Sequence, residues 1–118
     1  MDEIAYQGLL FDFYGALLTP HQRQIYEDAV FNDMSLSEIA DLYGISRQGV
    51  HDLLKRCDKI LETYEEKLHL VERFSRIRKK MGEIDTSLDE LIKTTGDEAV
   101  LSAVNNIKLL SSNILGEI

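Results

Sequence analysis

The sequence predicts an all-α protein of five to seven helices. Apolar residues recur at spacings of three and four along most of the 118 residues, which is the periodicity of one helix face. Several segments also begin with a capping residue and end near a glycine. No stretch alternates apolar and polar residues between turn residues, so no β-strand is expected. We expect a single all-α domain, 1–118, because a chain of this length can bury one hydrophobic core.

The N-terminal part is expected to form two helices. Residues 3–17 carry an aromatic-rich apolar stripe, which is typical of core packing. Thr19 and Pro20 indicate the start of the next helix, because threonine caps a helix and proline lacks the N–H that the first turn leaves unbonded. Gln22 completes a capping box with Thr19, and Asn32 marks the end of this helix.

Residues 35–56 carry the strongest pattern, two short helices joined by a tight turn. Ser35 caps the first helix, and Glu38 stands three residues later, as in a capping box. Gly44 falls where that helix must end, and glycine tolerates the left-handed backbone of such an end. Ser46 then caps the second helix. This is the pattern of a helix-turn-helix, whose second helix normally enters a DNA major groove. The alternative is an ordinary helical hairpin without nucleic acid.

The helix that follows the turn is expected to be long, because no glycine or proline lies between Gly49 and Gly82. Its apolar seam runs from Cys57 to Met81 at spacings of four and three. Such a seam packs against another helix of the same chain or across a dimer. We expect Gly82 to end this helix, with a break within residues 69–75 as the alternative.

Two further helices are expected before the C-terminus. The first covers about residues 87–95, Gly96 ends it, and Asp97 caps the last helix. The helix-turn-helix portion is thus 18–60, and 61–118 is a helical extension and candidate dimerisation region. We predict a homodimer, because the extension offers more hydrophobic face than short helices need.

The charge of the chain is unevenly distributed. The net charge is −8, the wrong sign for an indiscriminate phosphate binder. Residues 1–45 contain one basic and eight acidic residues, whereas residues 67–80 contain six basic and one acidic. Any affinity for nucleic acid is therefore expected to come from residues 46–80.

The sequence indicates no enzyme, metal or cofactor site. His21, His51 and His69 are isolated from one another, and Cys57 lies on an apolar helix side, where an inert thiol is expected. The glycines stand singly, without a phosphate-binding fingerprint. The single cysteine, the acidic N-terminus and the lack of a long apolar run favour a cytoplasmic protein without membrane insertion.

The exposed-looking face of the second motif helix is the first candidate nucleic-acid site. Its members are Ser46, Arg47, Gln48, His51, Lys55 and Arg56. Gln48 carries the donor and acceptor that suit an adenine edge, and the Arg47 fork suits guanine or phosphate. Asp52 lies among them and disfavours a phosphate. The alternative is a solvated helix face.

A basic stretch further along the chain is the second candidate. Its members are Lys67, Arg73, Arg76, Arg78, Lys79 and Lys80. Arg73, Arg76 and Lys80 share one helix face by spacing and could grip a nucleic-acid backbone, including that of A-form RNA. The same patch could instead meet an acidic protein or the acidic N-terminal half of this chain.

Two family resemblances are visible in the sequence. The segments LTPHQR (18–23) and SLSEIADLYGISRQGV (35–50) resemble region 4 of bacterial sigma-70-type factors, which reads the −35 promoter element. A closer similarity covers most of the chain and is to the YlxM family of helix-turn-helix proteins of Gram-positive bacteria. It rests on FDFYGALLT (11–19), SRQGVHD (46–52) and KILETYEEKL (59–68).

The YlxM resemblance implies an all-α protein encoded beside the signal recognition particle genes, which influences that pathway through its GTPase or RNA, or acts as a regulator. The sigma resemblance implies that Arg47, Gln48, His51 and Lys55 lie where region 4 holds its DNA-facing side chains. We therefore expect a helix-turn-helix regulator that binds nucleic acid, DNA rather than RNA, in the setting of signal recognition particle targeting. The alternative is an accessory protein that docks on the particle's RNA or GTPase and uses the helix-turn-helix as a scaffold.

Overall fold

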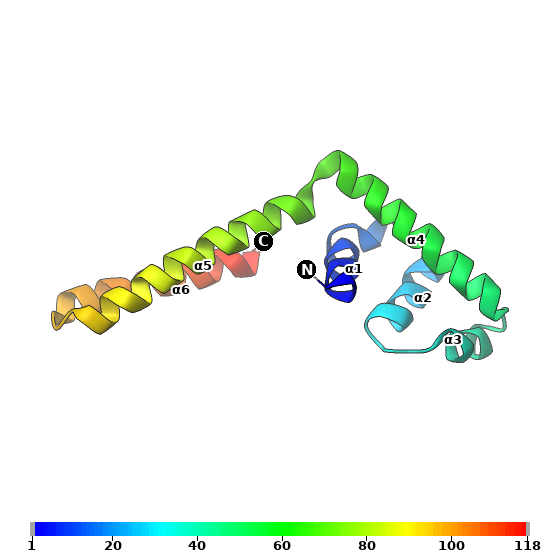
Figure 1. The fold of residues 1–118 in the computed structure, drawn as a ribbon, viewed down its shortest axis with the longest axis horizontal. Coiled ribbons are helices and arrows are strands. Elements are labelled where there is room, and N and C mark those ends of the chain that lie inside the picture. Colours follow the sequence, from blue (N-terminus) through cyan, green and yellow to red (C-terminus); the bar gives the residue numbers. More distant parts are fainter. Residues whose placement is uncertain (1, 118) are drawn as a thin grey trace. The chain divides into compact units, whose positions relative to one another are not determined.

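The computed structural model of the protein describes residues 2–117, which form six α-helices and one 3₁₀ turn, with no β-strand among them. The prediction of an all-α fold with five to seven helices is confirmed. The helices belong to two compact units, residues 1–71 and residues 72–118. Figure 1 colours them along the sequence.

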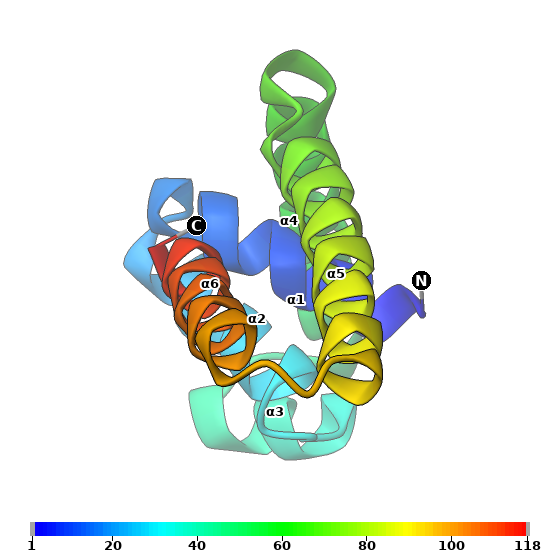
Figure 2. The same cartoon turned by 90° about the vertical axis from the view of Figure 1, so that its left-hand side faces the viewer.

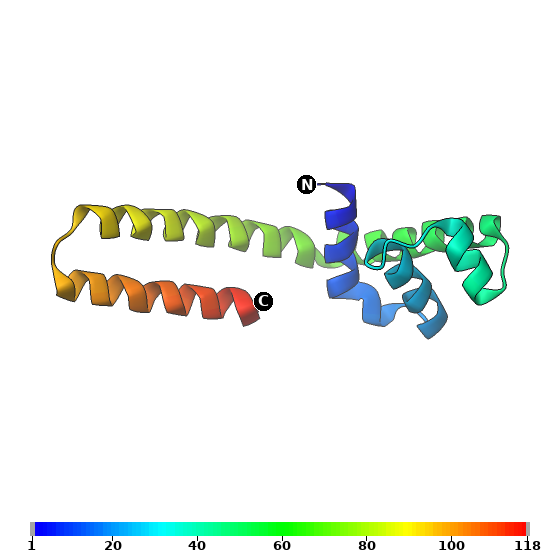
Figure 3. The same ribbon diagram turned by 90° about the horizontal axis from the view of Figure 1, so that it is seen from below.

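The first unit packs three short helices and a 3₁₀ turn against one long helix (Figure 1). Its elements are α1 (Glu3–Tyr14), η1 (Gly15–Leu17), α2 (Pro20–Val30), α3 (Leu36–Tyr43) and α4 (Arg47–Leu68). Helices α1, α2 and α3 all contact α4, which is therefore the central helix of this unit. The view from below shows the three short helices gathered along α4 (Figure 3).

The predicted starts of α2 and α3 are confirmed, because each rests on a local side-chain bond. The Thr19 hydroxyl accepts a hydrogen bond from the Gln22 amide at 3.2 Å, and the Gln22 side chain accepts one from the Thr19 amide at 3.0 Å. Ser35 and Glu38 form the same reciprocal pair, at 3.1 Å in both directions. These capping boxes fix where α2 and α3 begin.

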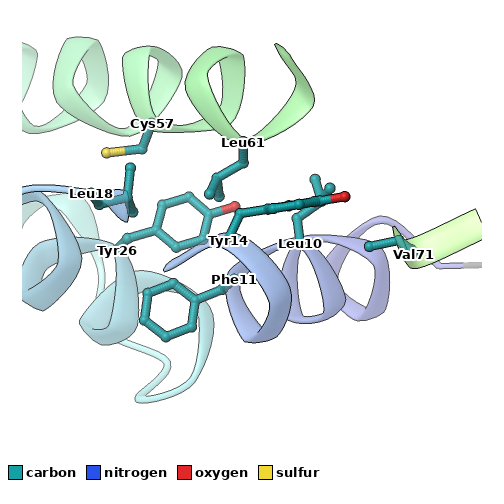
Figure 4. Packing of buried hydrophobic residues seen from close by; sticks show 8 residues of the cluster. All are labelled: Leu10, Phe11, Tyr14, Leu18, Tyr26, Cys57, Leu61 and Val71. Atoms are coloured by element: carbon teal, nitrogen blue, oxygen red, sulfur yellow. The ribbon is translucent and has the colours of Figure 1, made fainter. Parts of the chain in front are cut away.

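The core of the first unit lies between α1, α2 and α4 (Figure 4). Cys57 and Leu61 from α4 meet aromatic side chains of α1 and α2. The rings of Phe11 and Tyr26 stack with centroids 5.8 Å apart and planes 12° apart. Burying such aromatic surface contributes most of the stabilisation of a core this small.

A separate small core holds the helix-turn-helix together. It consists of Ile25, Ile39, Ala40 and Val50, which come from α2, α3 and α4. Ala40 lets α3 approach α4, and Gly44 ends α3 with φ +67°, the left-handed backbone that the sequence predicts there. The two motif helices are therefore fixed to each other and to α2.

The break between α4 and α5 (Leu70–Thr94) lies at His69, which has φ +56°. Side chains from earlier in the chain satisfy the first amides of α5. The Tyr14 hydroxyl accepts from the Leu70 amide at 3.1 Å, and the buried Glu65 carboxylate accepts from the Val71 amide at 2.9 Å. The prediction of one long helix with a continuous apolar seam from Cys57 to Met81 is thus wrong. The alternative, a break within residues 69–75, is confirmed.

The second unit is a hairpin of α5 and α6 (Glu98–Glu117), which run antiparallel and side by side (Figures 2 and 3). Lys108 of α6 forms ion pairs with Asp85, at 3.5 Å, and with Asp89, both from α5. Gly82 lies inside α5, so the predictions that it ends a helix and that a separate helix covers residues 87–95 are wrong. The Asp97 carboxylate accepts from the Ala99 amide at 2.9 Å, as expected of the residue that caps α6.

Candidate nucleic-acid interface

The candidate interface begins where the turn delivers the chain into α4. The Ser46 hydroxyl accepts a hydrogen bond from the Gly49 amide at 2.9 Å, so it caps α4 as predicted. The neighbouring N–H groups of the first turn have no partner within a helix and provide a site that favours anions. Arg47 and Gln48 occupy this turn, and both are exposed.

The remaining predicted residues continue along the same helix. Lys55 and Arg56 are exposed, and the side chain of His51 is 44% exposed. Gln48, His51 and Lys55 are spaced by three and four residues, so they share one face of α4, with Arg56 beside them. The structure therefore brings the six predicted residues together on the first three turns of one helix.

A shallow surface hollow lies at the start of this face. It is lined by Leu36 of α3 together with Arg47, Gln48 and His51 of α4. The lining of the hollow thus combines one apolar side chain from the first motif helix with polar side chains from the second. Such a combination can receive the edge of a base or its methyl group as well as a phosphate.

Asp52 lies among these residues and accepts a hydrogen bond from one of them. The Gln48 side-chain amide donates to the Asp52 carboxylate at 2.9 Å. The Nδ1 atom of His51 lies 3.6 Å from the same carboxylate oxygen, beyond hydrogen-bond distance. The acidic group that the sequence places among the candidate residues therefore holds Gln48 and lowers the positive potential of the face.

A second groove runs along the later turns of α4 and was only partly anticipated from the sequence. It is lined by Arg56, Lys59, Ile60, Thr63, Tyr64 and Lys67. Lys59 was not predicted as a site residue, although its spacing of three from Arg56 places it on the same side of the helix. The groove extends the cationic surface of α4 away from the motif.

The second predicted basic patch is divided between two helices. Lys67 lies in the last turn of α4, whereas Arg73, Arg76 and Lys80 lie on one exposed face of α5. Arg76 also pairs with Glu72 at 3.6 Å. Arg78 and Lys79 point to other sides of α5, and Arg78 lines a groove against α6. Only three of the six residues therefore share one helix face.

A buried carboxylate, that of Asp28, connects the helix-turn-helix to α2. Asp28 of α2 accepts hydrogen bonds from the Tyr43 hydroxyl at 2.6 Å and from the Asn32 amide at 2.8 Å. The Tyr43 bond lowers the pKa of Asp28 below its ordinary value, and the Asn32 bond adds to this, although burial opposes both. These bonds tie the end of α3 to α2 and so position the turn that leads into α4.

Three further features of the described residues bear on metal ligation, thiol chemistry and membrane spanning. Among residues 2–117, no three His, Cys, Asp or Glu side chains are grouped to hold a metal ion. The thiol of Cys57 is buried, and burial raises its pKa to about 11, as expected of an inert structural cysteine. No helix in the described part of the chain is long and apolar enough to cross a membrane.

The fold and the exposed start of α4 define a helix-turn-helix protein. The family described as "Putative helix-turn-helix protein, YlxM / p13 like" has a model that matches residues 1–99. The chain belongs to this family, UPF0122. A UPF0122 protein of Thermoanaerobacter pseudethanolicus is 44% identical over 106 residues, which cover 90% of this chain and 91% of the relative. One of Caldanaerobacter subterraneus is 52% identical over 83 residues, covering 70% and 71%.

Proposed function

We propose that this chain is a regulatory protein that binds nucleic acid, DNA rather than RNA, through the first three turns of α4. The observation that supports this most directly is the exposure of Arg47 and Gln48 in the first turn of the second motif helix. In helix-turn-helix proteins this turn contacts base edges, while the first helix crosses the backbone.

The side chains divide into two roles on this proposal. Arg47 and Gln48 read base edges, because their donors and acceptors match guanine and adenine. Lys55 and Arg56 neutralise phosphates one to two turns further along. Two phosphate-neutralising cations on a chain of net charge −8 bind modestly, with a slope in log affinity against log salt of about −2.

The setting follows from the YlxM resemblance of the sequence. We place the protein in the cytoplasm, with a binding rather than a catalytic role, as a regulator linked to signal recognition particle targeting. It would act as a homodimer, so that two motif helices could meet two half-sites of one duplex.

A second candidate function is docking on the RNA or the GTPase of the signal recognition particle. Two observations favour it. Asp52 holds Gln48, which weakens the motif helix as a base reader. Arg73, Arg76 and Lys80 meanwhile present an exposed cationic face on α5. On this alternative the helix-turn-helix serves as a scaffold.

A binding titration tests the proposal. The full chain is titrated against random duplex DNA, signal recognition particle RNA and the particle's GTPase at about 50 and about 200 mM salt, a fourfold difference in salt concentration. Three variants accompany it: Arg47→Ala/Gln48→Ala, Arg73→Ala/Arg76→Ala/Lys80→Ala, and the control Lys93→Ala/Asn113→Ala. The control removes one cation and one amide from exposed positions outside both faces.

Each outcome assigns the function to one face. Salt-sensitive duplex binding that the Arg47→Ala/Gln48→Ala variant loses and the control keeps supports the regulator. Binding of RNA or GTPase that only the α5 variant loses supports the accessory protein. Absence of binding to all three ligands refutes both.

A further inference from the structure

The hairpin of α5 and α6 has an apolar side that none of its own residues cover. Between the two helices, the buried residues of α6 are Val104 and Ser111, and α5 contributes only half-buried ones beyond Val71. Two helices with so little core do not account for their own stability in water. The hairpin therefore needs a further apolar surface against it.

Five of the seven exposed large apolar residues of the hairpin follow a heptad spacing; the other two are Leu109 and Leu110. The five are Ile77, Ile84 and Leu91 on α5, and Ile107 and Ile114 on α6. These five side chains are between 38% and 48% exposed. Residues seven apart lie on one face of a helix, which is the spacing of a seam that packs against another helix.

The two apolar faces lie on the same side of the hairpin. The ion pair of Asp85 with Lys108 marks where α5 and α6 face each other. Ile84 and Ile107 each precede one of these residues by a single position. In two antiparallel helices, the residues one position before the contact residues lie on the same side of the helix pair. Helices α5 and α6 are antiparallel, so Ile84 and Ile107 lie on the same side of the hairpin.

The opposite side of the hairpin is different in character. One step after Asp85, the same seven-residue spacing brings Lys79, Thr86 and Lys93 to the surface of α5. Leu109 follows Lys108 on α6 and stands alone there as a large apolar side chain, 61% exposed. The hairpin thus has one polar side and one apolar side, and the exposed Arg73 and Lys80 border the apolar side, since Lys80 lies three residues after Ile77 and four before Ile84.

We infer that the apolar side of the hairpin packs against the same side of a second copy of this chain, forming a four-helix bundle. The surface is self-complementary, because heptad-spaced Ile and Leu residues of one copy are the natural partners of the same residues in another. With Leu110 and the half-exposed seam residues, each hairpin offers on the order of 500 Å², so two copies bury roughly 1,000 Å². That area is about the lower limit for a specific protein–protein interface.

The inference rests on the homodimer of the proposed function, and sedimentation equilibrium of the full chain without nucleic acid tests it separately from nucleic-acid binding. At micromolar concentration we expect twice the chain mass of 13.5 kDa. Wild-type protein that stays at the chain mass overturns the inference without recourse to any variant, and this is the result expected if the first unit or another protein covers the hairpin.

Two variants then identify the face. Ile84→Glu/Ile107→Glu should raise the dimer dissociation constant at least about 100-fold, because each glutamate would be buried between apolar neighbours. Leu109→Glu, on the polar side of the same helix, should leave it unchanged. Circular dichroism monitors the helical content of both variants. A dimer that survives the double substitution, or that Leu109→Glu disrupts, overturns the assignment.

Discussion

The side-chain amide of Gln48 donates a hydrogen bond to the carboxylate of Asp52, one turn later on α4 and 2.9 Å away. This pair lies at the centre of the proposed interface and gives the motif helix an internal competitor for its ligand. An incoming base must displace the carboxylate from Gln48, and an incoming phosphate meets a negative charge. We therefore expect a substitution of Asp52 alone to change the affinity of the interface for nucleic acid.

Asp52→Ala should strengthen binding of duplex DNA by roughly fivefold at low salt, because it removes a negative charge and releases Gln48. Fluorescence anisotropy with a labelled duplex measures this. Glu83→Ala, which removes an exposed acid from α5, provides the matched control and should change the affinity little. Equal affinities of the Asp52→Ala variant and the wild type would contradict the proposed interface.

Tyr14→Phe should destabilise the first unit by about 2 kcal/mol, because the hydroxyl bonds the buried Glu65 carboxylate at 2.6 Å and caps α5 through Leu70. Tyr6→Phe is the control, since its hydroxyl meets Glu62 at 3.1 Å in a less buried place, and it should cost less than about 1 kcal/mol. Urea unfolding followed by tyrosine fluorescence reports on this unit, where all five tyrosines lie. Similar losses for both variants would refute the special role of Tyr14.

Asp28 should make the stability of the first unit depend on pH in the acid range. Its pKa is lowered in the folded state, so its contribution is present above the ordinary value of 3.8 and is lost as the pH falls through the folded value. Asp28→Asn should therefore be less stable than wild type at pH 7, with the difference narrowing below about pH 4. Urea unfolding at several pH values measures the difference, and a gap that stays constant with pH would refute it.

Cys57 should react with a thiol reagent only when the first unit unfolds, because its side chain is fully buried and burial raises its pKa to about 11. At pH 8 we expect labelling at least about 100-fold slower in buffer than in urea. Ser112→Cys adds an exposed thiol and should label at once in either condition. Rapid labelling of Cys57 in the folded wild type would contradict the packing of the core.

The elements that the sequence predicts correctly are those with local causes. The caps at Thr19, Ser35 and Ser46 depend on atoms within three residues, and the left-handed end at Gly44 depends on one residue. The break at His69 has no such signal, because the groups that stabilise it include Tyr14, more than fifty residues earlier. Tertiary contacts therefore stabilise the left-handed backbone of His69, a conformation that is uncommon in residues other than glycine.

At Gly82 a local signal predicted a helix end that the structure does not have. A glycine is a local signal for the end of a helix, but α5 continues through it because Asp85 and Asp89, just beyond it, pair with Lys108 of α6. The candidate interface was predictable in its members, since all six lie within eleven consecutive residues of one helix and its cap. The division of the second basic patch was not, because it depends on the break at His69.

The bonds of Tyr14 to Glu65 and Leu70 also set the order in which the protein can mature. Helix α1 is synthesised well before the residues of α4 and the start of α5 that help to bury it. At a translation rate of about 5–20 residues per second, Tyr14 waits roughly 3 to 10 seconds for residues 65–71. The side chains of α1 therefore lack their partners from α4 until residues 57–71 have been synthesised, and only then can the core of the first unit be completed.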